Sequence, residues 1–360
     1  MIRVGIVGAS GWAASSHLPA LAGLDGFAVT AVATTRQDSA DRVAAAHGVP
    51  LALTDAAALA ARPEVDLVVV SVRAAGHAAV IRAALAAGKH VLSEWPLGVD
   101  AAEAGQLARE AAAAGVAHAV NLQGVHSPDV RYVADLLAGG RIGRLQAAVL
   151  VAAGDPLGGP RIAPELAWST DPAGGTTLLS IMAGHFLAVL LRITGPLAEA
   201  TARIPHAHDR VEVAGTGRTV PGGGAPSQVL LLGTLANGAA ASVTVHGGSG
   251  SPDGFLLRLV GTDGTLTATA PRPGSYPHWS DWEVRIDGEP APVPPHYRAG
   301  VPFGPDSGPV ANVAAGYRAF ADALDHGRTP APDFHAAAAH HRLLATLERS
   351  AATGTSRRID

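Results

Sequence analysis

The chain has 360 residues, of which 48% are hydrophobic and 16% are charged, and its formal net charge is −4. This length suits one large or two ordinary domains, and the composition is ordinary for a protein with a sizeable core. The charge gives no reason to expect binding to nucleic acid. Because the chain has no cysteine, disulfides, thiol nucleophiles and thiolate metal sites are excluded, and we expect a cytoplasmic protein.

Two further features concern membranes. The N-terminal sequence has no charged segment before a long apolar run, so we expect no signal peptide. The most apolar stretch, residues 178–191, is about 14 residues long, whereas a bilayer span needs roughly 20. We therefore expect a buried helix there and no contact with a membrane.

The first 120 residues alternate between short β-rich runs and longer Ala-rich runs, a pattern that predicts βαβ units and a parallel sheet. Glycines follow the helical runs where C-terminal caps are expected. The predicted strands are 2–7, 28–33, 67–72 and 90–93, and the predicted helices are 17–22, 39–47, 77–87 and 101–114.

After residue 120 the pattern changes, because several strands follow one another without helices between them, which is typical of an antiparallel sheet. We expect an α/β chain with a doubly wound domain at 1–121 and an α+β domain with an open sheet at 122–360, whose last helices pack back on the first domain. The predicted strands are 145–152, 229–235, 240–246, 255–261 and 283–286, the predicted helices are 128–137, 178–192, 310–326 and 334–350, and Pro-rich loops are expected at 271–277 and 290–309.

A glycine-containing turn follows the first predicted strand. A dinucleotide site needs a tight turn, a close approach of backbone to pyrophosphate, and a small residue where helix meets strand. Gly8, Gly11 and Ala14 suit these positions, and the helix N-terminus is expected to hold the phosphates. Ser10 stands where the strict fingerprint has glycine, and a purely structural turn is the alternative interpretation.

The end of the second strand indicates the choice of cofactor. An Asp or Glu there usually holds the ribose hydroxyls of NAD. This chain instead has Thr34, Thr35 and Arg36. Without a carboxylate to repel a 2′-phosphate, and with an arginine to pair with it, NADP is favoured over NAD. The alternative is that Arg36 is simply a solvated arginine at the start of a loop.

Three motifs bear on the family. They are Glu94-Trp95-Pro96 after the fourth predicted strand, Gly174-Gly175-Thr176-Thr177 leading to His185, and Tyr317-Arg318-Ala319-Phe320 near the end. With them the chain resembles the glucose–fructose oxidoreductase/inositol dehydrogenase (Gfo/Idh/MocA) family over nearly its whole length. The resemblance implies a Rossmann domain, hydride transfer between a nicotinamide and a sugar, cyclitol or related alcohol, and a homodimer or homotetramer formed through the C-terminal sheet.

Further motifs resemble a subgroup of that family that contains a fungal galactose-pathway transcriptional repressor. They include Gly11-Trp12-Ala13, Ser16-His17-Leu18-Pro19, Ser71-Val72-Arg73 and Leu122-Gln123-Gly124. The alternative function is therefore a dinucleotide-binding regulator without catalysis. The cofactor contacts implied by the resemblance, together with the turn and the second strand, are Gly8, Ser10, Gly11, Trp12, Thr34, Thr35, Arg36, Ser71, Val72, His77, Glu94, Trp95, Pro96 and Gln123.

The catalytic positions depart from the family pattern. Typical members have a lysine where this chain has Trp95, and an indole does not titrate in the useful range. Lys89 is the only lysine. It precedes the strand that leads to Glu94, too far from the C-terminal end of that strand to replace the missing lysine. Many members also have an Asp four residues before the histidine, a position that Ser180 does not fill. His185 is the one remaining candidate for proton transfer at neutral pH, and Trp95 either stacks on nicotinamide or sugar or only fills space.

The substrate contacts are the least defined. Trp168, Arg161, Ser180 and the group His278, Trp279 and Trp282 lie on segments that are expected to shape a polar pocket, with ordinary packing as the alternative. Two histidine pairs suggest a metal, His206 and His208 beside Asp209, and His340 and His341. Neither pair has a convincing third ligand nearby in the sequence, so we expect no metal. The predicted partner is a small, polyhydroxylated substrate.

Overall fold

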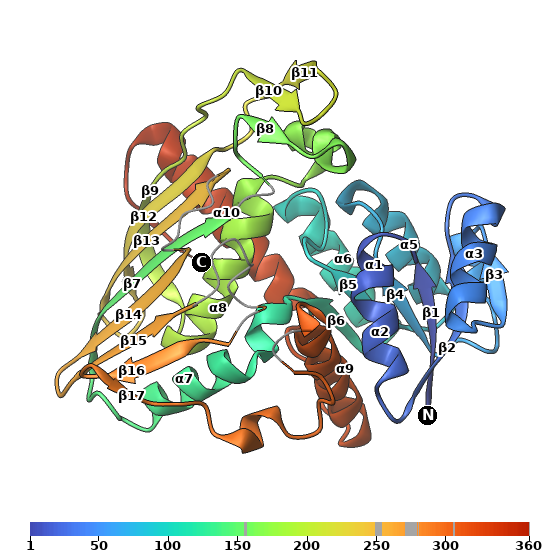
Figure 1. Cartoon of the computed structure of the whole chain (residues 1–360), viewed down its shortest axis with the longest axis horizontal. Coiled ribbons are helices and arrows are strands. Elements are labelled where there is room, and N and C mark those ends of the chain that lie inside the picture. The colour runs from blue at the N-terminus through green and yellow to red at the C-terminus, as the bar shows by residue number, and fades with distance from the viewer. Residues whose placement is uncertain (155–156, 249–253, 271–278, 280, 305–306, 360) are drawn as a thin grey trace. The chain divides into compact units, whose positions relative to one another are not determined.

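The computed structural model of the chain describes residues 1–154, 157–248, 254–270, 279, 281–304 and 307–359. The chain forms two compact units (Figure 1). Unit 1 contains residues 1–123 and 300–341, and unit 2 contains residues 124–299 and 342–360. The domain limits expected from the sequence, 1–121 and 122–360, stay a prediction, and each unit is described by itself below.

Unit 1 contains a parallel six-stranded sheet with the order β3-β2-β1-β4-β5-β6. This is the doubly wound order of dinucleotide-binding domains, so the predicted fold class is confirmed. All four residues of β4 are buried, as expected for a strand whose sheet is covered on both faces. The strands are β1 Ile2–Val7, β2 Phe27–Ala33, β3 Leu51–Leu53, β4 Leu67–Val70, β5 His90–Glu94 and β6 His118–Asn121.

Helix α6 of unit 1 begins and ends at recognisable caps. The side chain of Asp100 accepts a hydrogen bond from the backbone N–H of Glu103 at the start of α6, and Gly115 ends that helix in the left-handed conformation. α9 comes from far along the chain, and its Tyr317 and Phe320 are buried in the same core as β1. The helices are α1 Trp12–Ser15, α2 His17–Ala22, α3 Gln37–His47, α4 Ala56–Ala60, α5 Ala74–Ala86, α6 Ala101–Ala114 and α9 Val310–Asp325.

Unit 2 contains a nine-stranded sheet with the order β17-β16-β15-β14-β7-β13-β12-β9-β18, in which β7 and β13 pair in parallel and their other neighbours are antiparallel. The predicted, largely antiparallel C-terminal sheet is therefore confirmed. Its strands are β7 Leu145–Gly154, β9 Leu197–Arg203, β12 Gln228–Leu235, β13 Ala240–Gly247, β14 Phe255–Gly261, β15 Thr265–Thr269, β16 Glu283–Ile286, β17 Glu289–Pro290 and β18 Arg357–Arg358.

A smaller sheet with the order β11-β10-β8 accompanies the large one. Its strands are β8 Arg161–Ile162, β10 Arg210–Val213 and β11 Arg218–Pro221. The sequence predicted none of these strands, because each has only two to four residues and their apolar pattern is correspondingly weak. The other helices named here are η1 Gln123–His126, α7 Pro128–Ala138, α8 Gly184–Thr194 and α10 Phe334–Thr353.

The strands of the large sheet alternate between buried and less buried residues. On β12, Val229 and Leu231 are buried, whereas Leu230 is half-buried and Leu232 is 66% exposed. The register places Leu232 opposite Ser242, which in turn lies opposite Val149. One face of this sheet therefore faces the core of unit 2. The other is an open face that mixes apolar, Thr and Ser side chains with charged ones, since Val149 lies opposite the exposed Arg258.

The long apolar segment is a helix in two forms. A π-helix, η4, covers Leu178–Ala183, and α8 continues it. With the turns before it the helical segment runs over Pro172–Thr194, 23 residues, which is long and apolar enough to span a membrane by length and composition. The expectation that the segment is too short was therefore wrong. Burial of 78% of its most apolar window is what a core helix shows.

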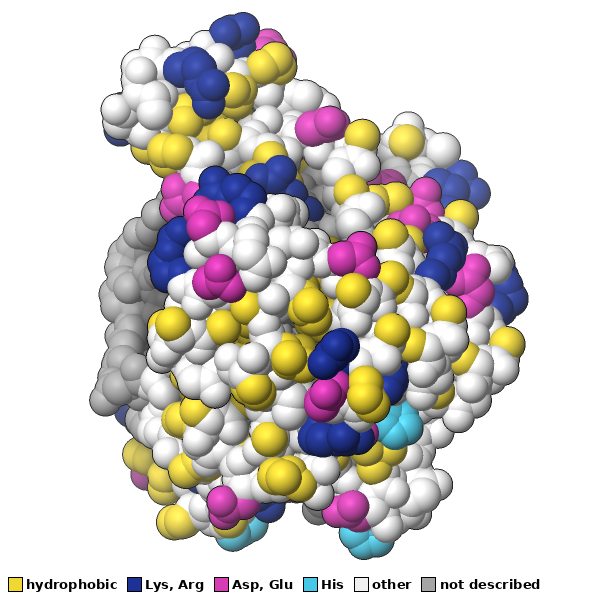
Figure 2. Space-filling view, turned by 90° about the vertical axis from the view of Figure 1, so that its right-hand side faces the viewer, with side chains coloured by type: hydrophobic (Ala, Val, Ile, Leu, Met, Phe, Trp, Pro, Cys, Tyr) yellow, Lys and Arg dark blue, Asp and Glu magenta, His cyan; other side chains and the backbone are white. Residues whose placement is uncertain are grey.

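Charged side chains are mixed by sign on the face shown in Figure 2. Basic and acidic residues lie next to one another there. Among the described residues several such side chains pair, for example Arg62 with Glu64 and Arg82 with Glu110. This surface has no single-sign field of the kind that steers a polyanion. The expectation that the protein does not bind nucleic acid stays a prediction.

Candidate cofactor-binding site

The turn at residues 8–12 has the backbone geometry of a phosphate-binding loop. Gly8 has a φ of 86° and Gly11 a φ of 55°, conformations that favour glycine. A Cβ at Gly8 would lie 2.3 Å from the carbonyl oxygen of Ser71, so a larger residue does not fit. The N–H groups of Gly8 and Ala9 donate to the carbonyl oxygen of Ala33 at 2.9 and 3.3 Å, which leaves the later part of the turn for a phosphate.

The helix after this turn is divided at Ser16. α1 has only four residues, and α2 has six. The Ser16 hydroxyl donates to the carbonyl oxygen of Trp12 at 2.6 Å, a kind of bond that bends helices. The sequence predicted a single helix over 17–22 whose N-terminus holds the phosphates. With α1 this short, we expect the backbone N–H groups of the turn, rather than the dipole of a long helix, to hold a phosphate.

The end of β2 presents a charged, exposed surface. The Thr34 hydroxyl donates to the carbonyl oxygen of Arg36 at 2.9 Å, and Thr35 is exposed. The Arg36 side chain is 71% exposed and lies 3.4 Å from Asp38, which Arg42 also approaches at 3.6 Å. The sequence interpretation overlooked Asp38. A solvent-exposed pair of this kind contributes little stability, so Arg36 is able to leave Asp38 for a phosphate.

The loop after β4 supplies a polar group that lacks a partner. Within the described part of the chain, the hydroxyl of Ser71 is buried and has no hydrogen-bond partner. The neighbouring Val72 carbonyl lies 3.0 Å from Nε2 of His77, and Nδ1 of His77 lies 3.4 Å from the hydroxyl of Ser93. Burial lowers the pKa of His77. His77 therefore links the ends of β4 and β5, and its predicted contact with a cofactor stays a prediction.

Glu94, the last residue of β5, carries a carboxylate held from several elements. Its Oε1 lies 2.6 Å from Nε2 of His17 and accepts from Nδ2 of Asn121 at 2.5 Å. Burial favours the neutral acid, but hydrogen bonds from His17, Asn121 and Trp12 outweigh it and lower the pKa of Glu94. The group is therefore an ionised carboxylate at the carboxyl end of the sheet, able only to accept hydrogen bonds.

Trp95 and Pro96 follow Glu94 and are joined by a cis peptide bond. The Trp95 indole is 4% exposed and packs on the imidazole of His341 with ring centroids 4.5 Å apart, and on that of His340 at 5.0 Å. Nε2 of His341 accepts from the backbone N–H of Leu97 at 3.1 Å. This packing supports the space-filling interpretation of Trp95, and its stacking on nicotinamide stays a prediction.

Two further positions complete the description of unit 1. Gln123 is 3% exposed and begins η1, directly after β6. Lys89 lies before the N-terminal end of β5, and its ammonium group donates to the carbonyl oxygens of Arg62 and Val65 at 3.1 and 2.8 Å. The only lysine thus stabilises a loop at the opposite end of the strand from Glu94.

These residues fit a nicotinamide dinucleotide. The glycine turn admits a close approach of backbone, the unpartnered Ser71 hydroxyl lies beside it, and Glu94 accepts from a hydroxyl or amide. Sequence reasoning missed His17, Asn121 and Tyr317, the side chains that surround Glu94. His17 and Tyr317 both lie in motifs that carry the family resemblance, but neither motif indicated that the two residues lie beside Glu94.

Unit 2 contains the predicted proton-transfer residue. His185 is the second residue of α8 and is 6% exposed. It follows the π-helix directly, and such helices occur frequently at functional sites. Ser180, five residues earlier, forms a capping box with Thr177, whose backbone N–H donates to the Ser180 hydroxyl at 2.8 Å. Ser180 therefore has a local structural role, and its contact with substrate stays a prediction.

The other predicted substrate residues lie in separate parts of unit 2. The indole of Trp168 donates to the carbonyl oxygen of Glu165 at 2.7 Å, and Arg161 pairs with Glu212 at 3.0 Å. Trp282 is 5% exposed and packs on Phe255 with ring centroids 4.8 Å apart. Trp279 is also described, whereas His278 lies outside the described residues.

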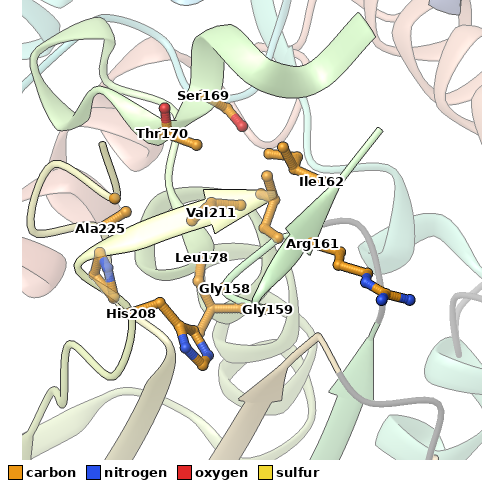
Figure 3. A pocket seen from close by; sticks show the side chains of 13 residues that line it. Gly158, Gly159, Arg161, Ile162, Ser169, Thr170, Leu178, His208, Val211 and Ala225 are labelled. Carbon is orange, nitrogen blue, oxygen red and sulfur yellow. The ribbon is translucent and has the colours of Figure 1, made fainter. Parts of the chain in front are cut away.

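An open pocket lies between the small sheet and the start of η4, and its empty space of about 390 Å³ includes open solvent. Figure 3 shows Ser169 and Thr170 on one side of it and His208 on the other. Both hydroxyls donate to backbone carbonyls of their own turn, at 2.8 and 3.0 Å. The pocket therefore offers mainly apolar and glycine surface, and it does not bring Trp168 or Ser180 together with Arg161.

Comparison with known proteins agrees with this architecture. The family model described as an oxidoreductase family with an NAD-binding Rossmann fold matches residues 2–122, and the model of the Gal80p C-terminal domain matches residues 128–270. The super-repressor mutant of Gal80p from Saccharomyces cerevisiae has a similar structure, with a TM-score of 0.88 at 20% identity over 99% of this chain and 98% of that one. Levoglucosan dehydrogenase in complex with NADH and L-sorbose gives a TM-score of 0.86 at 18% identity, over 100% of this chain and 99% of that one.

Curated relatives are more similar in sequence. The dTDP-3,4-didehydro-2,6-dideoxy-alpha-D-glucose 3-reductase of Streptomyces violaceoruber is 32% identical over 77% of this chain and 76% of its own length. Dehydrogenase aclE of Aspergillus oryzae is 32% identical over 54% of this chain and 55% of its own length. The same 3-reductase from Actinomadura kijaniata is 36% identical over 59% of this chain and 63% of its own length. With both its Rossmann unit and its C-terminal sheet matched, the chain belongs to the Gfo/Idh/MocA family of oxidoreductases.

Proposed function

We propose that the protein is an NAD(P)-dependent oxidoreductase that moves a hydride between nicotinamide and a sugar, a cyclitol or a related small alcohol or carbonyl compound. The main support for this proposal lies at the carboxyl edge of the six-stranded sheet. The Gly8 turn, the hydroxyl of Ser71, which has no hydrogen-bond partner among the described residues, and the ionised carboxylate of Glu94 all lie at that edge. The Streptomyces violaceoruber relative is a nucleotide-sugar reductase, and levoglucosan dehydrogenase was solved with NADH. Both support a carbohydrate-like substrate.

Different groups of the protein bind the cofactor and transfer the proton. The turn at residues 8–12 holds the pyrophosphate, and Glu94 fixes the riboside end. Nicotinamide, when bound, supplies or accepts the hydride. His185 is the candidate that gives or takes the substrate proton, directly or through a water that it orients. No lysine is present at the Trp95 position, and the only lysine, Lys89, is committed to two backbone carbonyls.

NADP is the proposed cofactor in preference to NAD. Arg36 carries an exposed guanidinium at the end of β2, where a 2′-phosphate reaches. Its pairing with Asp38 is weak because both side chains are mostly exposed. A phosphate offers a doubly charged partner to the same guanidinium.

The proposal includes assembly and location. The open face of the large sheet, with Val149, Leu232 and their neighbours, supports a homodimer or homotetramer formed through it. The partner of the protein is a small polyhydroxylated molecule, and the location is cytoplasmic, as expected for a chain without cysteine.

A second function is favoured by one observation. Trp95 stands where typical members carry a lysine, and it is packed away on two imidazoles. A dinucleotide-binding regulator keeps cofactor binding without that group, and the fold is similar to Gal80p. Such a protein binds the cofactor, turns over no metabolite and binds a specific protein partner.

One experiment tests the oxidoreductase directly. The purified protein is mixed with NADPH or NADH and with nucleotide-linked ketosugars, free ketosugars and cyclitol ketones, and loss of the reduced-nicotinamide absorbance is followed. His185→Gln is expected to lower turnover by roughly 100-fold or more, the size of a general acid–base contribution, with cofactor affinity unchanged. His206→Gln, at an exposed histidine of the same unit, is the control. Unchanged turnover in His185→Gln excludes His185 from the reaction.

A further inference from the structure

A buried chain of hydrogen bonds runs through unit 1 behind Glu94. His17, in α2, is fully buried. Its Nδ1 lies 2.7 Å from the hydroxyl of Tyr317 in α9, and its Nε2 lies 2.6 Å from Oε1 of Glu94. Asn121, at the end of β6, donates to the same oxygen at 2.5 Å. Four elements separated by up to 300 residues in the sequence therefore meet at one carboxylate.

The direction of these hydrogen bonds follows from their chemistry. Burial, with the neighbouring charge of Glu94, raises the pKa of Tyr317 well above its ordinary value, so its phenol keeps its hydrogen. Because the ionised Glu94 only accepts hydrogen bonds, Nε2 of His17 carries a hydrogen and donates to it. In the neutral imidazole, Nδ1 then accepts from the phenol of Tyr317. With this tautomer, both ring nitrogens of His17 and the hydroxyl of Tyr317 are satisfied, as buried polar groups require.

The arrangement leaves a defined part of Glu94 for a ligand. Oε1 is held by His17 and Asn121. An ionised carboxylate accepts up to about four hydrogen bonds, so capacity remains for a donor. β4 to β6 form the second half of a doubly wound sheet, which takes the second nucleotide of a dinucleotide. In a nicotinamide cofactor the donors of that half are the ribose hydroxyls and the carboxamide.

We propose that His17 and Tyr317 are positioning residues that hold the Glu94 carboxylate for a donor on the nicotinamide riboside half of the cofactor. The inference rests on the proposed binding of a nicotinamide dinucleotide. Tyr317 acts through His17, and neither touches the cofactor. A helix from the last part of the chain thus completes the Rossmann unit's binding edge.

Matched variants separate this role from support of the fold. In His17→Gln, the side-chain amide places its N–H near the position of Nε2 and keeps the bond to Glu94. In His17→Asn, the shorter amide lies near Nδ1 and loses that bond. Tyr317→Phe removes only the hydroxyl, and Glu94→Gln removes the charge. Melting temperature is measured for every variant.

The readout is the affinity of the full-length protein for NADPH, for NADH and for ADP, by isothermal titration. We expect His17→Asn and Glu94→Gln to weaken dinucleotide binding at least roughly tenfold, Tyr317→Phe roughly fivefold, and His17→Gln less than threefold. Affinity for ADP, which lacks the nicotinamide riboside, is expected to stay within twofold in all of them. That selective loss is not produced by general destabilisation.

Three results decide the matter. Selective loss of dinucleotide affinity, rescued in His17→Gln, supports the positioning role. Equal losses for ADP and dinucleotide, or losses that follow the melting temperature alone, overturn it, because the chain of bonds then only supports the fold. Equal dinucleotide affinity in all variants and the unmodified protein overturns it as well. If the unmodified protein binds none of the three nucleotides, the proposed function itself fails.

Discussion

His341 makes the stability of the protein depend on pH in a calculable way. It is 6% exposed, and its Nε2 accepts the backbone N–H of Leu97, two residues after Trp95. Burial lowers its pKa to about 3, assisted by the nearby His340 and His77 and opposed by Asp100. Protonation would also remove the acceptor for Leu97, since a protonated imidazole only donates.

The size of the effect follows from linkage. Above pH 6.5 His341 is neutral in both the folded and unfolded states and has no influence. As the pH falls below 6.5, the unfolded state binds a proton that the folded state refuses down to pH 3 or so, so stability is lost across that window. At pH 5 the pH lies about 1.5 below the pKa of His341 in the unfolded state, which corresponds to about 2 kcal/mol of lost unfolding free energy.

Urea denaturation at pH 7 and pH 5, followed by circular dichroism, measures this loss. His341→Gln keeps an acceptor near the position of Nε2 but does not titrate, so it is expected to reduce the pH 7 to pH 5 difference by about 2 kcal/mol. His335→Gln, at an exposed position of the same helix, is expected to change nothing. The reasoning is refuted if His341→Gln leaves the difference between the two pH values unchanged.

The remaining predictions concern binding and assembly. Gly8→Ala places a methyl group 2.3 Å from the carbonyl oxygen of Ser71. The positive φ at this position alone costs an alanine about 1–2 kcal/mol. The affinity for the dinucleotide is therefore expected to fall at least roughly tenfold in a titration. Gly26→Ala, at a φ of 87° with open space around it, should leave affinity unchanged. Arg36→Ala is expected to lower the affinity for NADPH roughly tenfold and to leave the affinity for NADH unchanged. Loss of affinity for both cofactors would contradict a contact with the 2′-phosphate. Arg42→Ala, at an equally exposed arginine, is the control. Leu232→Lys is expected to turn the proposed oligomer into monomers in light scattering, and an oligomer whose mass the substitution leaves unchanged would exclude this face as the interface.

Long, strongly patterned elements were predicted well. β1, α2, α6 and β14 begin and end at the predicted residues, because a continuous apolar run or an Ala-rich stretch ending at glycine leaves little choice. The elements that were missed are short or mixed. β3 has three residues, and β15 reads Thr-Leu-Thr-Ala-Thr, a pattern whose polar residues lie on the open face.

The candidate site was predicted where it is local in the sequence. The glycine turn, Arg36 and Glu94 follow strands of one parallel sheet, and such strands end at a common edge. The partners of Glu94 lay beyond sequence reasoning, because Tyr317 is 300 residues from His17 and meets it only through packing of α9 on α2. The packing of Trp95 on His340 and His341 is of the same long-range kind.

Hydride transfer from labelled cofactor tests the central claim most directly. The protein is incubated with NADPH deuterated at both C4 positions and a fractionated extract of small metabolites, and the products are examined by mass spectrometry, with His185→Gln alongside. The oxidoreductase account predicts a reduced, carbohydrate-like product that carries one deuterium in the unmodified protein and is absent in the variant. Binding of NADPH without transfer of deuterium to any metabolite, together with no reduction of NADP⁺ in the reverse assay, would contradict it and favour the regulator.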